Sequence, residues 1–321
     1  MAGVRRSLAV DLAGLRLSTP VMIAAGCAGT GRELAGLVDM HKVGGLVSRT
    51  VTVLERRGAP TPRISEVPSG IVWETGLQNP GIDAFIAEEL PRLARSRVPV
   101  VVSIGGGTLE EYVRLTAALQ GRPEVAAIEI HLSGGDEELA REVLGAHADR
   151  VAEIVGAVAR LSLVPVFAKI PGGVGDVLGL SRAAIRAGAT GLTLCGSPPA
   201  VAVDPVRLRA DLGAVTGWLS GPVLKPLTLR SVLAVGRAMP EVPIVASGGV
   251  RTGQDGAECL LAGAWAVQVG TATLVDPAAP VQVARGIVRY LKAKGVASPG
   301  DIRGRVRVPA EFGPPQEGPR S

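Results

Sequence analysis

The sequence predicts a closed (β/α)8 TIM barrel preceded by a β-hairpin, and three observations indicate it. The chain has 321 residues, which suits a barrel of about 250 residues with additions. It is 47% hydrophobic and only 20% charged, so it can bury a large core and is not intrinsically disordered. Short apolar runs alternate with longer helical patterns, as in a parallel sheet covered by helices. A doubly wound open sheet is the structural alternative.

Eight runs are predicted to be the barrel strands. They are VMIAAG (21–26), GLVSRTVT (45–52), VPVVVSIGG (98–106), VAAIEIHLS (125–133), VPVFAKI (164–170), TGLTLCG (190–196), VPIVASGG (242–249) and AWAVQVGT (264–271). Between them, apolar residues recur three or four apart, which is typical of amphipathic helices. These helical segments are 83–96, 109–120, 136–161, 181–188, 226–239 and 280–295.

The two ends of the chain differ from this pattern. Residues 7–20 alternate apolar and polar side chains, which predicts a hairpin that closes the bottom of the barrel. The C-terminal stretch lacks periodicity, so we expect one domain over 1–305 and a mobile tail over 306–321.

Composition excludes several classes of protein. Aromatic residues make up 2% and the net charge of +5 is dispersed, so we expect no nucleic-acid partner. The cysteines, Cys27, Cys195 and Cys259, lie far apart, which argues against a metal site or a disulfide framework. No apolar run is long enough to span a membrane and no signal peptide is evident, so we expect a cytoplasmic protein without membrane contact.

Glycines end the seventh and eighth predicted strands. The active sites of such barrels lie at the carboxyl ends of the strands, and the last two loops commonly bind a phosphate. Gly248–Gly249 and Gly270–Thr271 offer backbone N–H groups and a hydroxyl for that purpose. No dinucleotide or Walker motif is present, so a phosphate-bearing barrel cofactor is favoured over NAD or ATP. Ordinary turn chemistry is the alternative explanation.

Several longer motifs carry a family resemblance. PVMIAAG, SRTVTVLERRGAPTPRISEVPSG, GLQNPGID, LSGPVLKPLTLR and VASGGVRTGQDGAECLLAGAWAVQVGTA together resemble class 1 dihydroorotate dehydrogenases. The most similar subtype is the one paired with an iron–sulfur flavoprotein subunit. The resemblance implies an FMN-dependent oxidoreductase that transfers hydride between a small, cyclic substrate and flavin N5. It also implies an electron-transfer flavoprotein subunit as partner, and a homodimer.

The same resemblance implies the cofactor residues. Lys169 matches the family lysine near flavin N1 and O2, where a cation stabilises the charge of reduced flavin. Ala25 and Gly26 would lie under the flavin ring and Ser103 at its polar edge, while Arg49 replaces a lysine on the second strand. The ribityl phosphate would be held by Ser220, Gly221, Gly248, Gly249, Gly270 and Thr271.

The substrate side departs from the family. Its loop N-x-S-C-P-N carries the cysteine base, and Gly134 stands at that position. The four asparagines expected around orotate are replaced by His131, Asp136, Trp73 and Gly196. Unpaired polar edges cost about 1–3 kcal/mol each, and loss of a base about 10²–10⁴ in rate. Both losses together indicate a substrate other than dihydroorotate.

The replacements supply chemistry of their own. His131 and Glu74 are candidate catalytic groups together with Lys169, and Trp73 could stack on a flat substrate. The predicted substrate-binding residues are Trp73, Glu74, His131, Gly134 and Gly196. As plain structural groups, these side chains would fill space or face solvent. Two alternatives stay open: a genuine dihydroorotate dehydrogenase of pyrimidine biosynthesis that uses a displaced base such as His131, and a non-catalytic flavin-binding subunit.

Overall fold

Eight parallel strands close into a barrel in the computed structural model, which describes residues 7–34, 36–132, 147–173 and 175–309. Around the barrel the order is β10-β15-β16-β3-β4-β7-β8-β9. All eight predicted strands are confirmed. Their bounds are Val21–Ile23 (β3), Gly45–Val47 (β4), Val100–Ile104 (β7), Ala127–His131 (β8), Val166–Pro171 (β9), Gly191–Gly196 (β10), Ile244–Ser247 (β15) and Ala266–Val269 (β16).

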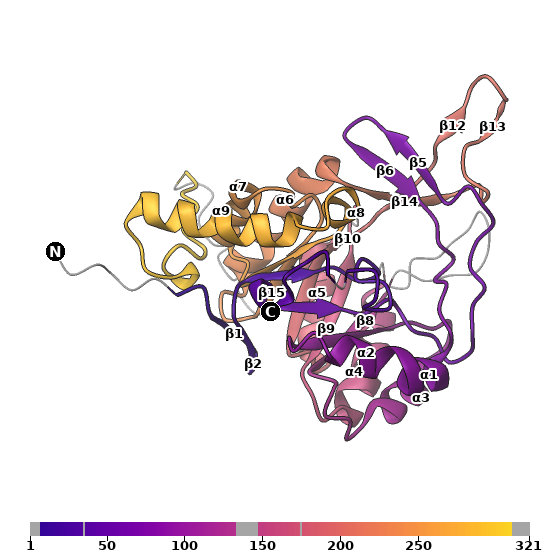
Figure 1. Ribbon diagram of the computed structural model, residues 1–321. Coiled ribbons are helices and arrows are strands. Elements are labelled where there is room, and N and C mark those ends of the chain that lie inside the picture. Colours follow the sequence, from indigo (N-terminus) through magenta and orange to yellow (C-terminus); the bar gives the residue numbers. More distant parts are fainter. Residues whose placement is uncertain (1–6, 35, 133–146, 174, 310–321) are drawn as a thin grey trace, which may run out of the picture.

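Helices cover the outside of the barrel (Figure 1). They are α1 (Ile82–Ala84), the π-helical turn η2 (Phe85–Glu89), α2 (Leu90–Ala94), α3 (Leu109–Leu119), α4 (Ala148–Leu161), α5 (Val177–Arg186), α6 (Lys225–Ala238), α7 (Gly253–Ala262), α8 (Thr271–Val275) and α9 (Ala279–Lys294). Short 3-10 turns occur at Met40–Lys42 (η1), Pro222–Leu224 (η4) and Pro299–Asp301 (η5). None of the helices in the described ranges combines the length and apolar character needed to cross a membrane.

The first crossover differs from the regular alternation that the sequence predicts. Between β3 and β4, the described residues form turns and the short η1, and no α-helix. Four glycines there, Gly26, Gly29, Gly31 and Gly36, have positive φ angles. Because such conformations cannot be repeated in a right-handed helix, this connection stays irregular.

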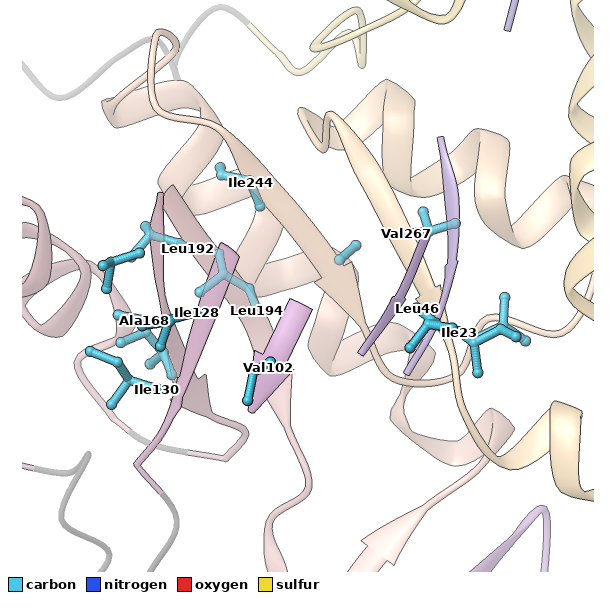
Figure 2. Packing of buried hydrophobic residues seen from close by; sticks show 14 of the residues in the cluster. Ile23, Leu46, Val102, Ile128, Ile130, Ala168, Leu192, Leu194, Ile244 and Val267 are labelled. Atoms are coloured by element: carbon cyan, nitrogen blue, oxygen red, sulfur yellow. The ribbon is translucent and has the colours of Figure 1, made fainter. Parts of the chain in front are cut away.

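Strand alternation sorts side chains into an outer and an inner set. The outward side chains of the strands pack against the helices in one large cluster, which includes Ile23, Leu46, Val102, Ile128, Ile130, Ala168, Leu192, Leu194, Ile244 and Val267 (Figure 2). Their neighbours along each strand point into the barrel, since successive side chains face opposite sides. The barrel interior is therefore built by a separate set of residues.

The lowest inward layer is apolar and the N-terminal hairpin closes it. Met22, Val47, Val101, Ala127, Phe167, Val245 and Ala266 form a second cluster with Leu12, Leu15 and Leu17. Those leucines come from strands β1 (Val10–Leu12) and β2 (Leu15–Leu17), which pair across a turn at Ala13–Gly14. The predicted hairpin at the bottom of the barrel is thus confirmed.

A second, antiparallel sheet lies outside the barrel and was not predicted. It joins β11 (Pro199–Ala200), β14 (Gly217–Ser220), β6 (Gly70–Trp73) and β5 (Ile64–Val67) in that order. The small hairpin of β12 (Val203–Asp204) and β13 (Arg209–Ala210) projects beside it (Figure 1). These strands are too short to show a clear period, and β14 pairs with a strand from a distant part of the chain, so local patterns do not reveal them.

The hairpin leucines should contribute strongly to stability. Leu17 is 1% exposed in the lower layer, so we expect Leu17→Ala to lower the free energy of unfolding by about 2–5 kcal/mol. Leu163 is 80% exposed, and Leu163→Ala should change it by less than about 0.5 kcal/mol. Urea unfolding of both variants measures the difference, and equal effects would show that the hairpin does not seal the core.

Candidate active site

A polar layer lies directly above the apolar floor of the barrel. Two residues beyond the floor positions on their strands stand Ser103, Glu129, Lys169, Thr193 and Gln268, which the alternation also directs inward. Glu129 is 1% exposed and accepts three hydrogen bonds. Oε1 accepts from Lys169 Nζ at 3.1 Å, and Oε2 accepts from Thr193 Oγ1 at 2.9 Å and Gln268 Nε2 at 2.7 Å.

Glu129 and Lys169 form a buried ion pair. Burial by itself raises the pKa of the Glu129 carboxyl, but the Lys169 ammonium and the three donors outweigh it and hold that pKa below its ordinary value. Glu129 is therefore an anion at neutral pH. The Lys169 side chain, 11% exposed, carries the compensating charge.

Glycines occupy the top of the interior. Gly26, Gly105, Gly249 and Gly270 stand one inward step above the polar layer. A Cβ on Gly26 would meet no atom within 4 Å, so space is open above it. A flat ligand can therefore approach the backbone at the mouth of the barrel.

His131 is the large side chain among these glycines. It ends β8 and lies opposite Lys169 in the strand register. Tyr112 Oη donates to the His131 carbonyl oxygen at 2.7 Å and fixes the backbone at this point. A Cβ on Gly105 would lie 3.7 Å from His131 Cβ and Cδ2, so the imidazole borders the mouth.

Two of the predicted phosphate residues, Ser220 and Thr271, meet at one corner of the mouth. Thr271 Oγ1 donates to Ser220 Oγ at 2.9 Å, which joins the end of β14 to the start of α8. Gly248 and Gly249 directly follow β15 and have φ angles of +118° and +78°. A Cβ on Gly248 would lie 2.8 Å from Thr228 Oγ1, and one on Gly249 2.7 Å from Lys225 Cα. Side chains are thus excluded and backbone N–H groups line the corner.

Trp73, the last residue of β6, and Glu74, the residue after it, lie in different surroundings. Trp73 lies in the outer sheet opposite Trp218 and Ile64. Glu74 is 4% exposed, and its Oε1 accepts from the backbone N–H of Gly76 at 2.6 Å. The carboxylate therefore also organises its own turn.

Arg49 and Ser103 make contacts within the protein. Arg49 Nε lies 3.2 Å from Glu89 Oε2, and its NH1 donates to the carbonyl oxygen of Gln78 at 3.3 Å. Desolvation raises the pKa of Glu89, although Arg49 opposes it. Ser103, fully buried, shares a hydrogen bond of 2.9 Å with Thr50.

Two further predicted positions concern the loops after β8 and β10. Gly134 lies outside the described residues, as does Asp136. Gly196 ends β10, and its carbonyl oxygen accepts from the Gly172 N–H at 2.6 Å. Burial raises the pKa of Cys195, beside it, to about 11, so this thiol is protonated at neutral pH and is a poor base.

Known proteins share this architecture and sequence. The sequence profile of the dihydroorotate dehydrogenase family matches residues 7–291. The chain belongs to the dihydroorotate dehydrogenase family. A relative from Geotalea daltonii, named dihydroorotate dehydrogenase B (NAD(+)), catalytic subunit, is 40% identical over 94% of this chain and 98% of the relative. A relative of the same name from Desulforudis audaxviator is 42% identical over 92% and 96%.

A solved structure agrees at the level of the fold. The crystal structure of DHODH in complex with ferulenol from Eimeria tenella superposes with a TM-score of 0.77 at 22% identity, covering 93% of this chain and 88% of that one. The predicted family is confirmed, and the subtype with a separate partner subunit fits the names of the relatives. The family consists of flavin-dependent oxidoreductases, so the predicted class of enzyme is also confirmed.

Three members of the polar layer were missed from the sequence. Glu129, Thr193 and Gln268 each interrupt an apolar strand with a polar residue. A carboxylate inside a strand buried on both faces is rare unless it is paired. That signal is present for Glu129, because Lys169 lies on the neighbouring strand of the barrel.

Removing the Glu129 charge should destabilise the fold in a pH-dependent way. Glu129→Gln leaves Lys169 buried without its counter-charge, so we expect a loss of about 3–5 kcal/mol at pH 7. Because the pKa of Glu129 is lowered from 4.5 in the folded state, its stabilisation is complete above that pH and is lost as the pH falls further. The difference in the free energy of unfolding between Glu129→Gln and wild type should therefore become smaller at acidic pH.

Urea unfolding between pH 3 and pH 8 measures this difference. Glu153→Gln is the matched control, since Glu153 pairs with Arg150 at the surface and should contribute at most about 1 kcal/mol. A gap that stays constant with pH would contradict an ionised Glu129.

Proposed function

We propose that the chain is an FMN-dependent oxidoreductase that binds FMN across the mouth of the barrel. The observation that carries this is the arrangement of a phosphate corner and a buried lysine around one glycine-lined opening. Ser220, Gly221, Gly248, Gly249, Gly270 and Thr271 would hold the phosphate. Ala25 and Gly26 would support the ring, with Ser103 and Arg49 near its edge. When bound, FMN accepts or donates a hydride at N5.

The residues that line the mouth would then have separate roles. Lys169 would supply a positive charge near the part of the ring where negative charge develops on reduction. The Ser220–Thr271 pair and the strand-end glycines would hold the phosphate and so orient the ring for the substrate. His131 borders the same mouth and is the candidate acid or base, with Glu74 second.

We propose a small, cyclic substrate other than dihydroorotate. The family base position is Gly134, which has no side chain, and the orotate asparagines are replaced by His131, Asp136, Trp73 and Gly196. Hydride transfer at a CH–CH or CH–NH bond needs a proton acceptor near the mouth. His131 would serve as this acceptor, and Trp73 and Glu74 would adapt the pocket to a different shape.

A second candidate is a genuine dihydroorotate dehydrogenase in which His131 replaces the cysteine. It is favoured by relatives of that name that match more than nine-tenths of the chain. Their designation as a catalytic subunit also supports the proposal that this chain works with an electron-transfer flavoprotein subunit. A homodimer and a cytoplasmic location complete the proposal.

The phosphate corner predicts a sharp effect on cofactor binding. Gly249→Ala would place a methyl group against the start of α6 at a positive φ angle, so the loop must shift. We expect FMN affinity to fall roughly tenfold or more. Gly121→Ala is the control, because Gly121 also has a positive φ but open space around it. Fluorescence titration of FMN compares them, and colourless wild-type protein after FMN reconstitution would overturn the proposed function.

Anaerobic titration with L-dihydroorotate separates the two substrate candidates. For a changed substrate, the flavin spectrum should persist with dihydroorotate and bleach with dithionite. For the second candidate it should bleach promptly, and His131→Ala should slow the reduction about 10²–10⁴-fold. His41→Ala, an exposed histidine outside the mouth, is the matched control. Bleaching that is equally fast in His131→Ala would remove His131 as the base.

A further inference from the structure

Glu129 connects strands from opposite sides of the barrel. Around the closed sheet, β8 and β16 are separated by β9, β10 and β15 on one side and by β7, β4 and β3 on the other. Glu129 of β8 reaches Gln268 of β16 at 2.7 Å and Thr193 of β10 at 2.9 Å. The carboxylate therefore lies near the barrel axis, directly beneath the mouth.

Lys169 is paired with this carboxylate. Within the described ranges, its ion pair is with Glu129 Oε1 at 3.1 Å. Desolvation disfavours a buried ammonium unless an anion compensates it. The other donors to Glu129, Thr193 and Gln268, are uncharged, so they fix the carboxylate without competing for its charge.

The remaining titratable groups near Lys169 are few among the described residues. On β8, His131 is its register neighbour. Cys27 and Cys195 also sense the lysine charge, but burial raises the pKa of each to about 11, so both stay neutral near pH 7. Glu129 is thus the anion that faces the ammonium.

We propose that Glu129 is a positioning residue that keeps Lys169 protonated and directed at the cofactor ring. The inference rests on the proposed function, because the ring is what the ammonium would stabilise. Without the carboxylate, the buried neutral amine becomes favoured and its proton leaves to solvent. Stabilisation of reduced flavin would then require uptake of that proton, and would weaken as the pH rises.

The first test needs no flavin chemistry. Full-length protein, as purified, is labelled with trace acetic anhydride between pH 7 and pH 9, and Lys169 is compared with exposed Lys42 by peptide mass spectrometry. Since the neutral amine is the reactive form, Glu129→Gln should raise Lys169 labelling relative to Lys42 by roughly tenfold or more. Thr193→Val removes one donor and keeps the carboxylate, so it should label like wild type. An unchanged ratio in Glu129→Gln overturns the proposal.

The second test follows the bound flavin. As the pH rises at a fixed potential, the ratio of reduced to oxidised flavin should fall more steeply in Glu129→Gln than in wild type. The additional fall should be up to about tenfold per pH unit. The series is repeated in the His131→Ala background, since an imidazole also titrates in this range. A slope equal to wild type in both backgrounds refutes the positioning role.

Two further outcomes distinguish a folding defect from a loss of the cofactor. If Glu129→Gln does not fold, the double variant with Lys169→Met removes both charges and should recover soluble, folded protein. A double variant as unstable as the single one contradicts charge compensation. A wild-type chain that holds no flavin refutes the proposed function and the cofactor role, whereas unchanged labelling in a flavin-bound Glu129→Gln refutes only the role of Glu129.

Discussion

The interior of a closed barrel must be filled by the inward side chains of its own strands, and this constraint organises the molecule. Here the filling changes along the axis. Apolar side chains capped by Leu12, Leu15 and Leu17 occupy the bottom. A layer fixed by the Glu129–Lys169 pair follows, and glycines occupy the top. Because the apolar bottom of the barrel supplies the stability, the glycine-lined top can do without side-chain packing. This leaves room for a ligand.

The Glu129–Lys169 ion pair affects both the stability of the fold and the proposed chemistry. A buried carboxylate and ammonium add little to stability compared with apolar packing, so their retention calls for another reason. Lys169, in the polar layer, supplies a fixed positive charge one inward position below the opening. Glu129 is the anion that compensates this charge. Thr193 and Gln268 complete the hydrogen bonds of that anion. These hydrogen bonds fix the ion pair in place before any ligand binds.

The sequence predicted what strand periodicity and strand-end glycines encode. The eight strands and the bottom hairpin followed from such patterns, whereas the family followed from the resemblance of longer motifs. The predicted phosphate residues Ser220 and Thr271 are in contact. It did not predict the outer sheet, whose short strands pair across long separations. Nor did it predict the contacts of Arg49 with Glu89 and of Glu74 with its own turn. Side chains on loops choose among several partners, and only tertiary packing decides between them.

Family membership and a changed substrate are compatible because they depend on different parts of the chain. Identity of about 40% over almost the whole length establishes the family and its barrel. Substrate choice in barrel enzymes depends on a few loop side chains, which can change without disturbing a strand. A barrel with its cofactor residues intact can therefore accept a new ring once new polar partners replace the old ones. His131, the replacement at one of these positions, stands on the barrel itself, and its backbone is anchored by Tyr112.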